Sequence, residues 1–355
     1  MRTTITADST PRPKVPNTIG DPELDARIRQ LVADMGGEKP SELIVEMVIT
    51  ALKMSRDQTT VADLKMLNRA LKEMRFASRV FAPLKDRKKV TVFGSARTSE
   101  TAPEALAAEE FGRKMSERGY MIITGGGDGI MGAAHKGAGR DQSIGLNIRL
   151  PFEQAANPTI HGDRKLVNFN YFFTRKLNFV KESHAIVLFP GGFGTMDEGF
   201  EALTLMQTGK ARIFPIVFVD RPNGTYWKTV FDFLHNHLLF HKLISKEDFA
   251  FIRLSPSVDD AVEHIVQFYA NFHSYRWIGP RLVMRLQKAL RQEKLERMDN
   301  EFADVLASGK FELAGAFPEE SSEAEIAHLP RLVFQPHKRN FGRLRQIIDS
   351  VNHPE

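Results

Sequence analysis

The sequence predicts an α/β fold: a Rossmann-like parallel sheet with helices on both faces, plus helical N-terminal and C-terminal extensions. Short apolar runs alternate with helix-like segments, and glycine-rich turns follow several of the runs. Strands that are apolar on both faces are typical of a parallel sheet covered by helices. The runs predicted to form strands are 90–93, 120–124, 143–150, 185–189 and 213–219.

The region before the sheet has two parts. Residues 1–20 place three prolines among polar residues without a periodic apolar pattern, which predicts a disordered tail. Apolar residues at spacings of three and four then predict three helices within residues 21–85. Pro83 and the charged run 85–89 mark the end of this helical region.

The sheet and the segment after it follow from the same patterns. We expect the Rossmann-like domain over residues 86–275, with an amphipathic helix at 104–118 connecting its first two strands. Residues 276–355 are expected to form a helical C-terminal extension and tail, including a long charged helix near 280–306.

The composition excludes several classes of site and location. The 355 residues include no cysteine, which excludes disulfides, thiolate nucleophiles and cysteine-ligated metal centres. No stretch reaches the ~20 continuous apolar residues of a transmembrane helix, and the N-terminal tail lacks the apolar core of a secretory signal. We therefore expect a cytoplasmic protein with no membrane partner.

Charge and histidine placement point to a small-molecule site. The formal net charge of +5 is small for this length and suits phosphorylated ligands as well as nucleic acid. Basic clusters at 85–89 and 338–345 have no accompanying nucleic-acid motif, so we interpret them as solvated surfaces and expect no nucleic-acid partner. The histidines form no recognisable zinc pattern, and no metal is expected.

One glycine-rich turn predicts an anion-binding site. Residues 190–198, PGGFGTMDE, follow the apolar run 185–189 and begin a helix. The first N–H groups of a helix have no partners within it, and glycines let an anion approach them. We expect Thr195 to cap this helix and Glu198 to lie in its first turn, ionised at neutral pH. The same spacing also fits a capping box that serves helix stability alone.

A second glycine pattern leaves an alternative open. Residues 127–132, GDGIMG, match G-x-G-x-x-G between a predicted strand and a predicted helix. Glu153 lies about where the ribose-binding acid of a dinucleotide site is sought. Alone, this pattern would indicate a dinucleotide-binding Rossmann protein. The turn at 190–198 argues against that interpretation, because it places phosphate binding on a different strand.

Five segments, taken in order, resemble a known family. They are residues 94–97, 125–131, 145–154, 171–176 and 190–198. Together they resemble the LONELY GUY family, long labelled "possible lysine decarboxylase", and specifically its longer type II branch. The resemblance implies a catalytic domain that hydrolyses the N-glycosidic bond of nucleoside 5′-monophosphates, AMP-like or cytokinin nucleotides, to free base and ribose 5-phosphate. It also implies a homo-oligomer, dimeric or larger, and no cofactor.

The resemblance also assigns roles to residues of this chain. It implies that Arg175 and Glu198 are the catalytic pair. Glu198 would stabilise the positive charge that builds on the ribose as the C1′–N bond breaks, and Arg175 would bind the sugar or phosphate and polarise the departing base. The residues expected to contact the substrate are Ser95, Gly126, Gly127, Asp128, Lys176, Gly191, Gly192, Gly194 and Thr195.

Structural roles remain open for several of these residues. Arg175 and Lys176 could be an ordinary surface pair of a helix, while Ser95 and Asp128 could be simple turn residues. The aromatic run at 169–173 fits the core, or includes a ring that stacks on the base. The alternative function is a non-catalytic nucleotide sensor or carrier on the same scaffold, against which the presence of both candidate catalytic residues argues.

Overall fold

The computed structural model describes residues 18–36, 41–150, 155–221 and 223–353. The chain divides into two compact units, Met1–Leu71 and Lys72–Glu355. None of the helices in the described ranges is both long enough and apolar enough to span a bilayer.

The first unit is helical, as predicted. Helix α1 (Pro22–Asp34) packs on α2 (Ser41–Arg56), and their contact is formed by Ile28, Val45 and Ile49. The third predicted helix is α3 (Val61–Phe81), whose last part belongs to the second unit. The three predicted helices are therefore confirmed.

The second unit contains a seven-stranded parallel sheet with the order β4-β3-β2-β1-β5-β6-β7. The chain builds outward from β1 to β4 and then returns to place β5 on the other side of β1. Ligands of open α/β sheets bind at such a switch point, outside the carboxyl ends of the strands. The strands are β1 (Lys89–Phe93), β2 (Met121–Thr124), β3 (Ser143–Ile148), β4 (Leu166–Phe169), β5 (Ala185–Leu188), β6 (Ile216–Val219) and β7 (Ile252–Ser255).

Apolar runs in the sequence predict five of these strands but neither β4 nor β7. Both lie at the edges of the sheet and contain exposed residues. An edge strand is covered less completely than a central one, so its sequence does not form a continuous apolar run. The prediction from apolar runs therefore finds only the five inner strands.

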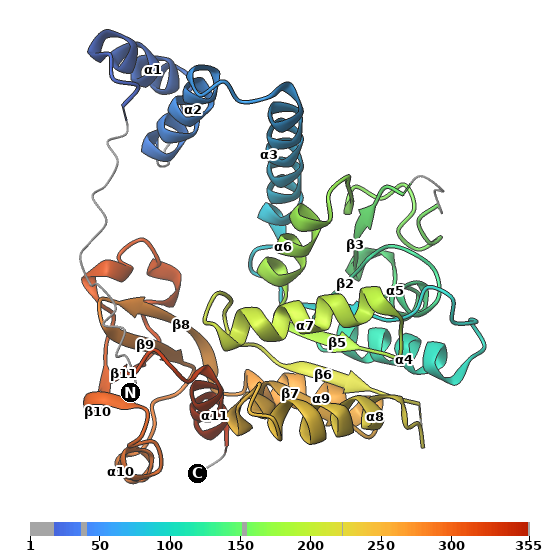
Figure 1. The fold of residues 1–355 in the computed structure, drawn as a ribbon. Helices are drawn as coiled ribbons and strands as arrows, with labels where there is room; N and C mark the ends of the chain where they lie inside the picture. Colours follow the sequence, from blue (N-terminus) through green and yellow to red (C-terminus); the bar gives the residue numbers. More distant parts are fainter. Residues whose placement is uncertain (1–17, 37–40, 151–154, 222, 354–355) are drawn as a thin grey trace. The chain divides into compact units, whose positions relative to one another are not determined.

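Helices cover both faces of the sheet, which confirms the predicted fold class (Figure 1). Residues of β2 alternate between two apolar clusters, with Met121 and Ile123 in one and Ile122 in the other. The cluster around Ile122 includes residues of α4 (Pro103–Glu117), α5 (Ile130–Ala138) and α9 (Val258–Phe268). The other includes residues of α6 (Phe172–Glu182) and α7 (Phe193–Gln207).

The C-terminal extension contains two α-helices, as its predicted helical character requires, but also a sheet that is not predicted from the sequence. This antiparallel sheet has the order β10-β11-β9-β8. In place of one long helix near 280–306, the chain forms β9 and the shorter α10. The elements are β8 (Phe272–Ile278), β9 (Arg281–Leu286), α10 (Gln292–Glu301), β10 (Leu306–Ala314), β11 (Arg331–Pro336) and α11 (Phe341–Asn352).

Buried charges explain why this sheet is hard to recognise in the sequence. Arg285 on β9 and Arg331 on β11 are buried, and both pair with the buried carboxylate of Glu320. Charged residues normally mark the exposed side of an element. Here a carboxylate that is distant in sequence from Arg285 compensates for burial, so the usual link between charge and exposure fails.

We expect Gly112→Ala to destabilise the second unit. Helices α4 and α5 pack so closely that a Cβ at Gly112 would overlap the backbone carbonyl oxygen of Ala134. Overpacking of this kind costs about 1–3 kcal/mol, measurable by urea unfolding. Gly315→Ala is the matched control, because a Cβ at Gly315 would meet no atom within 4 Å. Equal losses in the two variants would contradict the packing argument.

Candidate active site

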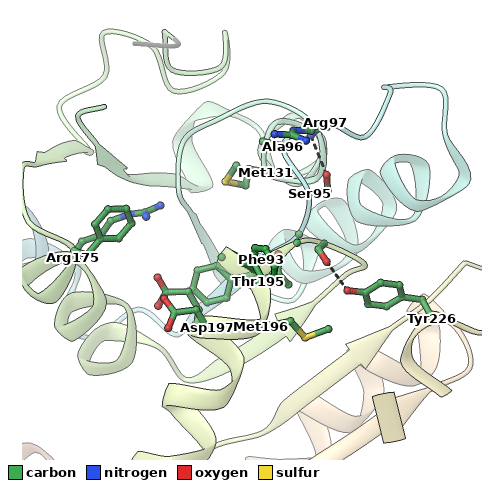
Figure 2. Close-up of a pocket in the computed structure, with 17 residues that line it drawn as sticks. Phe93, Ser95, Ala96, Arg97, Met131, Arg175, Thr195, Met196, Asp197 and Tyr226 are labelled. Carbon is green, nitrogen blue, oxygen red and sulfur yellow. Dashed lines mark hydrogen bonds between the residues drawn. The ribbon is translucent and has the colours of Figure 1, made fainter. Parts of the chain in front are cut away.

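A cavity of about 810 Å³ lies at the switch point, where the segments after β1 and β5 meet α6 and α7 (Figure 2). It brings together seven of the residues that sequence analysis assigns to the site. Those that line it are Ser95, Arg175, Gly191, Gly192, Gly194, Thr195 and Glu198. The remaining four, Gly126, Gly127, Asp128 and Lys176, are not among its lining residues.

Main-chain contacts fix the turn after β5. The backbone N–H of Ser95 donates to the carbonyl oxygen of Pro190 at 3.1 Å, and the Tyr226 hydroxyl donates to the carbonyl oxygen of Gly191. A Cβ at Gly191 would overlap the Thr195 side chain and lie 3.0 Å from the Ser95 nitrogen. Only glycine fits at this position, because the Ser95 backbone and the short Thr195 side chain cannot move aside for a Cβ.

The start of α7 differs from the prediction in one respect. The helix begins at Phe193, its N-cap is Gly192, and no side chain caps it. Thr195 is therefore the third residue of the helix and not its cap, and Glu198 lies in the second turn, so the predicted capping box is absent. Extended backbone at Gly192, with φ −88° and ψ −156°, lets the chain enter the helix three residues earlier than predicted.

This helix start has the properties of an anion site. Gly192 and Gly194 have open space where a Cβ would be. The first backbone N–H groups of a helix lack intrahelical partners, and the helix dipole places partial positive charge there. The Thr195 hydroxyl and Arg97 also line the cavity. A phosphate at the start of α7 would meet amide donors there, within a cavity that Arg97 also lines.

Glu198 is buried, with 7% of its surface exposed. Burial raises the pKa of its carboxyl to about 7, although Arg175 and Lys176 oppose that rise. The sequence-based prediction that Glu198 stays ionised at neutral pH is therefore wrong, because a pKa of about 7 leaves its carboxyl group partly protonated. The physical reason is that the helix dipole acts mainly within the first turn, so it compensates less for desolvation in the second.

Arg175 is held in place from two sides. Its Nε donates to the carbonyl oxygen of Leu146 at 2.8 Å, and its guanidinium carbon lies 5.1 Å from the centre of the Phe179 ring. A Cβ at Gly125 would lie 2.5 Å from Nη2 of Arg175, so the absence of a side chain there makes room for the guanidinium. Figure 2 shows Arg175 and Asp197 on the same side of the cavity, opposite Ser95 and Arg97.

The glycine segment after β2 is fixed from behind. Nδ2 of the buried Asn157 donates to the carbonyl oxygens of Gly126 and Gly127, both at 3.0 Å. The same Nδ2 lies 3.2 Å from Nδ1 of His135, and burial lowers the pKa of His135 to about 4, so this ring is neutral. These hydrogen bonds thus stabilise the glycine segment 125–127, whose first residue packs against the Arg175 guanidinium.

Asp128 and the second glycine pattern have separate surroundings. Asp128 lines a smaller cavity of about 280 Å³ together with Gly129 and Asn157. Gly129 has φ +62°, and a Cβ there would overlap the carbonyl oxygen of Ser95. Close packing of two loops therefore explains the second glycine of G-x-G-x-x-G. Glu153, the candidate ribose-binding acid of the dinucleotide alternative, lies outside the described residues.

Several lining residues are absent from the sequence-based site. Arg97, Met131 and Tyr226 belong to this group. Arg97 follows the Gly-Ser-Ala turn after the first strand, and that position in the sequence was a usable signal. Tyr226 lies 35 residues from the carbonyl group that it binds, and nothing in its sequence neighbourhood indicates this contact. Across the described ranges, no group of three or more histidine, aspartate or glutamate side chains is placed to hold a metal ion.

Comparison with known families supports the resemblance found in the sequence. Residues 131–265 match the family model described as "Possible lysine decarboxylase". One similar protein is a "Probable cytokinin riboside 5'-monophosphate phosphoribohydrolase" of Oryza sativa subsp. japonica, 32% identical over 34% of this chain and 49% of the relative. Another, of Arabidopsis thaliana, is named "Cytokinin riboside 5'-monophosphate phosphoribohydrolase" and is 28% identical over 34% of this chain and 57% of the relative. The chain spans about half the length of the curated relatives it matches.

Solved structures with similarity to this chain include two molybdenum-cofactor proteins. The carrier protein of Chlamydomonas reinhardtii is 21% identical, with a TM-score of 0.37 over 51% of this chain and 97% of the carrier. The binding protein of Rippkaea orientalis is 20% identical, with a TM-score of 0.35 over 51% of this chain and 97% of that protein. By the family model and the curated relatives, this chain is thus similar, through residues 131–265, to the family described as "Possible lysine decarboxylase" and to cytokinin riboside 5'-monophosphate phosphoribohydrolases.

Proposed function

We propose that the protein hydrolyses the N-glycosidic bond of nucleoside 5′-monophosphates, either AMP-like or cytokinin nucleotides, and releases the free base and ribose 5-phosphate. The observation that carries this proposal is a buried carboxyl group, Glu198, that shares one cavity with Arg175 and with the start of α7. The names of the curated relatives, cytokinin riboside 5′-monophosphate phosphoribohydrolases, support this substrate class.

In the proposed reaction, the first-turn amides of α7 and the Thr195 hydroxyl hold the 5′-phosphate. This anchor places the ribose near Glu198, which lies one turn further along the helix. As the C1′–N bond breaks, positive charge develops on the sugar and the Glu198 carboxylate stabilises it. Water supplies the hydroxyl group that bonds to C1′. The remaining proton of that water goes to the nitrogen of the departing base.

Arg175 has a complementary part in this reaction. Its Nε is occupied by the Leu146 carbonyl oxygen, so the terminal nitrogens of a fixed guanidinium are the ones available to the substrate. A guanidinium keeps its charge at neutral pH, and its forked donors suit sugar hydroxyls, phosphate oxygens or the acceptor atoms of a base. A non-catalytic nucleotide carrier would have no use for a buried carboxyl group whose pKa is close to 7.

We expect Glu198→Gln to lower kcat by about 10³-fold or more, while nucleotide binding persists, because the lost charge matters most in the transition state. In the wild type, kcat/KM should fall about tenfold per pH unit below the pKa of Glu198 at about 7, since protonation removes the carboxylate. Release of base is measured by chromatography and binding by calorimetry. Near-normal turnover in the variant would remove Glu198 from the mechanism.

A second expectation concerns the phosphate. If the start of α7 anchors the substrate, AMP should be hydrolysed with a kcat/KM at least about 10²-fold above that of adenosine, because binding energy at the phosphate positions the sugar. Competition by ribose 5-phosphate, but not by ribose, should accompany this preference. Equal rates for AMP and adenosine would separate the glycine turn from the reaction.

We also propose that the protein forms a homo-oligomer through the outer surface of α6. Phe172, Phe173 and Leu177 on this helix are each more than half exposed, with exposed fractions of 52%, 54% and 53%. Exposed apolar patches of this kind are typical of protein interfaces. Phe172 also lines the cavity, so a second copy at this surface would lie next to the substrate.

Leu177→Glu tests this interface. A charge at the centre of an apolar contact should dissociate the oligomer, which light scattering after gel filtration would detect as a lower mass. Leu106→Glu is the matched control, because Leu106 is 55% exposed on α4, away from the cavity. A monomeric wild type, or dissociation by both variants alike, would reject the α6 surface.

A further inference from the structure

Arg175 and Lys176 are neighbours on α6, but their side chains reach different elements. Arg175 binds the Leu146 carbonyl oxygen on β3, whereas Lys176 extends to α7. Nζ of Lys176 lies 2.7 Å from a carboxylate oxygen of Asp197 and 2.6 Å from one of Glu201. The Lys176 side chain is only 15% exposed, so these ion pairs are partly shielded from water.

The two carboxylates flank Glu198 along α7. Asp197 precedes Glu198 directly, and Glu201 follows it by three residues, which is nearly one helical turn. The charged groups that act on Glu198 are Arg175 and Lys176 from α6, and Asp197 and Glu201 from α7 itself. Lys176 is thus the cation that neutralises both acidic neighbours of the candidate catalytic carboxyl group.

We propose that Lys176 is a positioning residue, whose two ion pairs join α6 to α7 so that Arg175 and Glu198 are held at the same cavity. This inference rests on the proposed function. It differs from the sequence-based expectation that Lys176 contacts the substrate. A substrate contact would require Lys176 to leave two carboxylates, which would then stand unpaired beside Glu198.

The electrostatic consequence has a definite sign. Asp197 and Glu201 raise the pKa of Glu198, and Lys176 lowers it. Removing the lysine charge leaves two negative neighbours without their partner, so the Glu198 carboxyl should hold its proton to a higher pH. A lysine that served only to bind substrate phosphate would affect KM and leave this titration almost unchanged.

The test compares Lys176→Met, Lys176→Arg and a control, Lys181→Met. Lys181 lies on the same helix, is 49% exposed and pairs with Glu182 next to it in the chain. For Lys176→Met we expect the acid limb of kcat/KM to move up by about one pH unit and kcat at pH 7 to fall about fivefold, with less than about a twofold change in KM for AMP. Lys176→Arg should restore the profile, and Lys181→Met should match the wild type.

Two outcomes would overturn the proposal: a raised KM with an unmoved acid limb, or no rescue by arginine. Should Lys176→Met fail to fold, the double variant Asp197→Asn/Glu201→Gln serves instead. It removes both negative neighbours of Glu198 and should move the acid limb to lower pH, and an unmoved limb in this variant also contradicts the proposal.

A measurement independent of turnover separates this inference from the proposed function. Carboxyl ¹³C titration of glutamate-labelled protein, with Glu198→Gln used to assign the signal, reports the pKa of Glu198 directly. If the wild type releases no base from any nucleoside monophosphate, the proposed function fails. The positioning role still predicts a higher Glu198 pKa in Lys176→Met than in Lys181→Met, and equal values would reject it.

Discussion

The close approach of two backbone turns at the switch point of the sheet is the constraint on which the rest of the site depends. The Ser95 amide binds the Pro190 carbonyl oxygen, and at Gly191 the space for a side chain is already taken by Thr195 and by the Ser95 backbone. Backbone atoms cannot move aside as a long side chain can, so this contact fixes where α7 begins. The direction of its first amides and the depth of Glu198 both follow from that starting point.

The same packing determines the electrostatics of the cavity. Glu198 is placed far enough along α7 to be buried, and burial brings its pKa close to neutrality. The nearby cations are fixed by other contacts: Arg175 by the Leu146 carbonyl oxygen and Lys176 by two carboxylates. A buried carboxyl group with a raised pKa opposes stability, and such groups concentrate at functional sites. The arrangement therefore supports the proposed hydrolase function.

The glycines of the chain serve two different physical purposes. Gly192 and Gly194 leave open space at the start of a helix, as an anion-binding turn requires. Gly112 and Gly129 instead allow backbone segments to pack closely, and Gly125 makes room for the Arg175 guanidinium. Gly129 of the G-x-G-x-x-G pattern at 127–132 is a glycine of this packing type. The pattern therefore matches that of a dinucleotide site for a packing reason, while the cavity of about 810 Å³ lies beside the turn after β5.

The sequence by itself determined the fold class, the five inner strands, the glycine turn after β5 and the residues of the family motifs, because continuous apolar runs and glycine spacing are local signals. Only the tertiary structure decided the edge strands, the C-terminal sheet, the helix start at Phe193 and the partners of Lys176. Each of these depends on contacts between residues far apart in the chain. An edge strand pairs with a single neighbouring strand, Arg285 pairs with Glu320, and the Gly191 carbonyl oxygen accepts a hydrogen bond from Tyr226. The raised pKa of Glu198 belongs to the same group, since desolvation is a property of the packed site and has no signature in the order of residues.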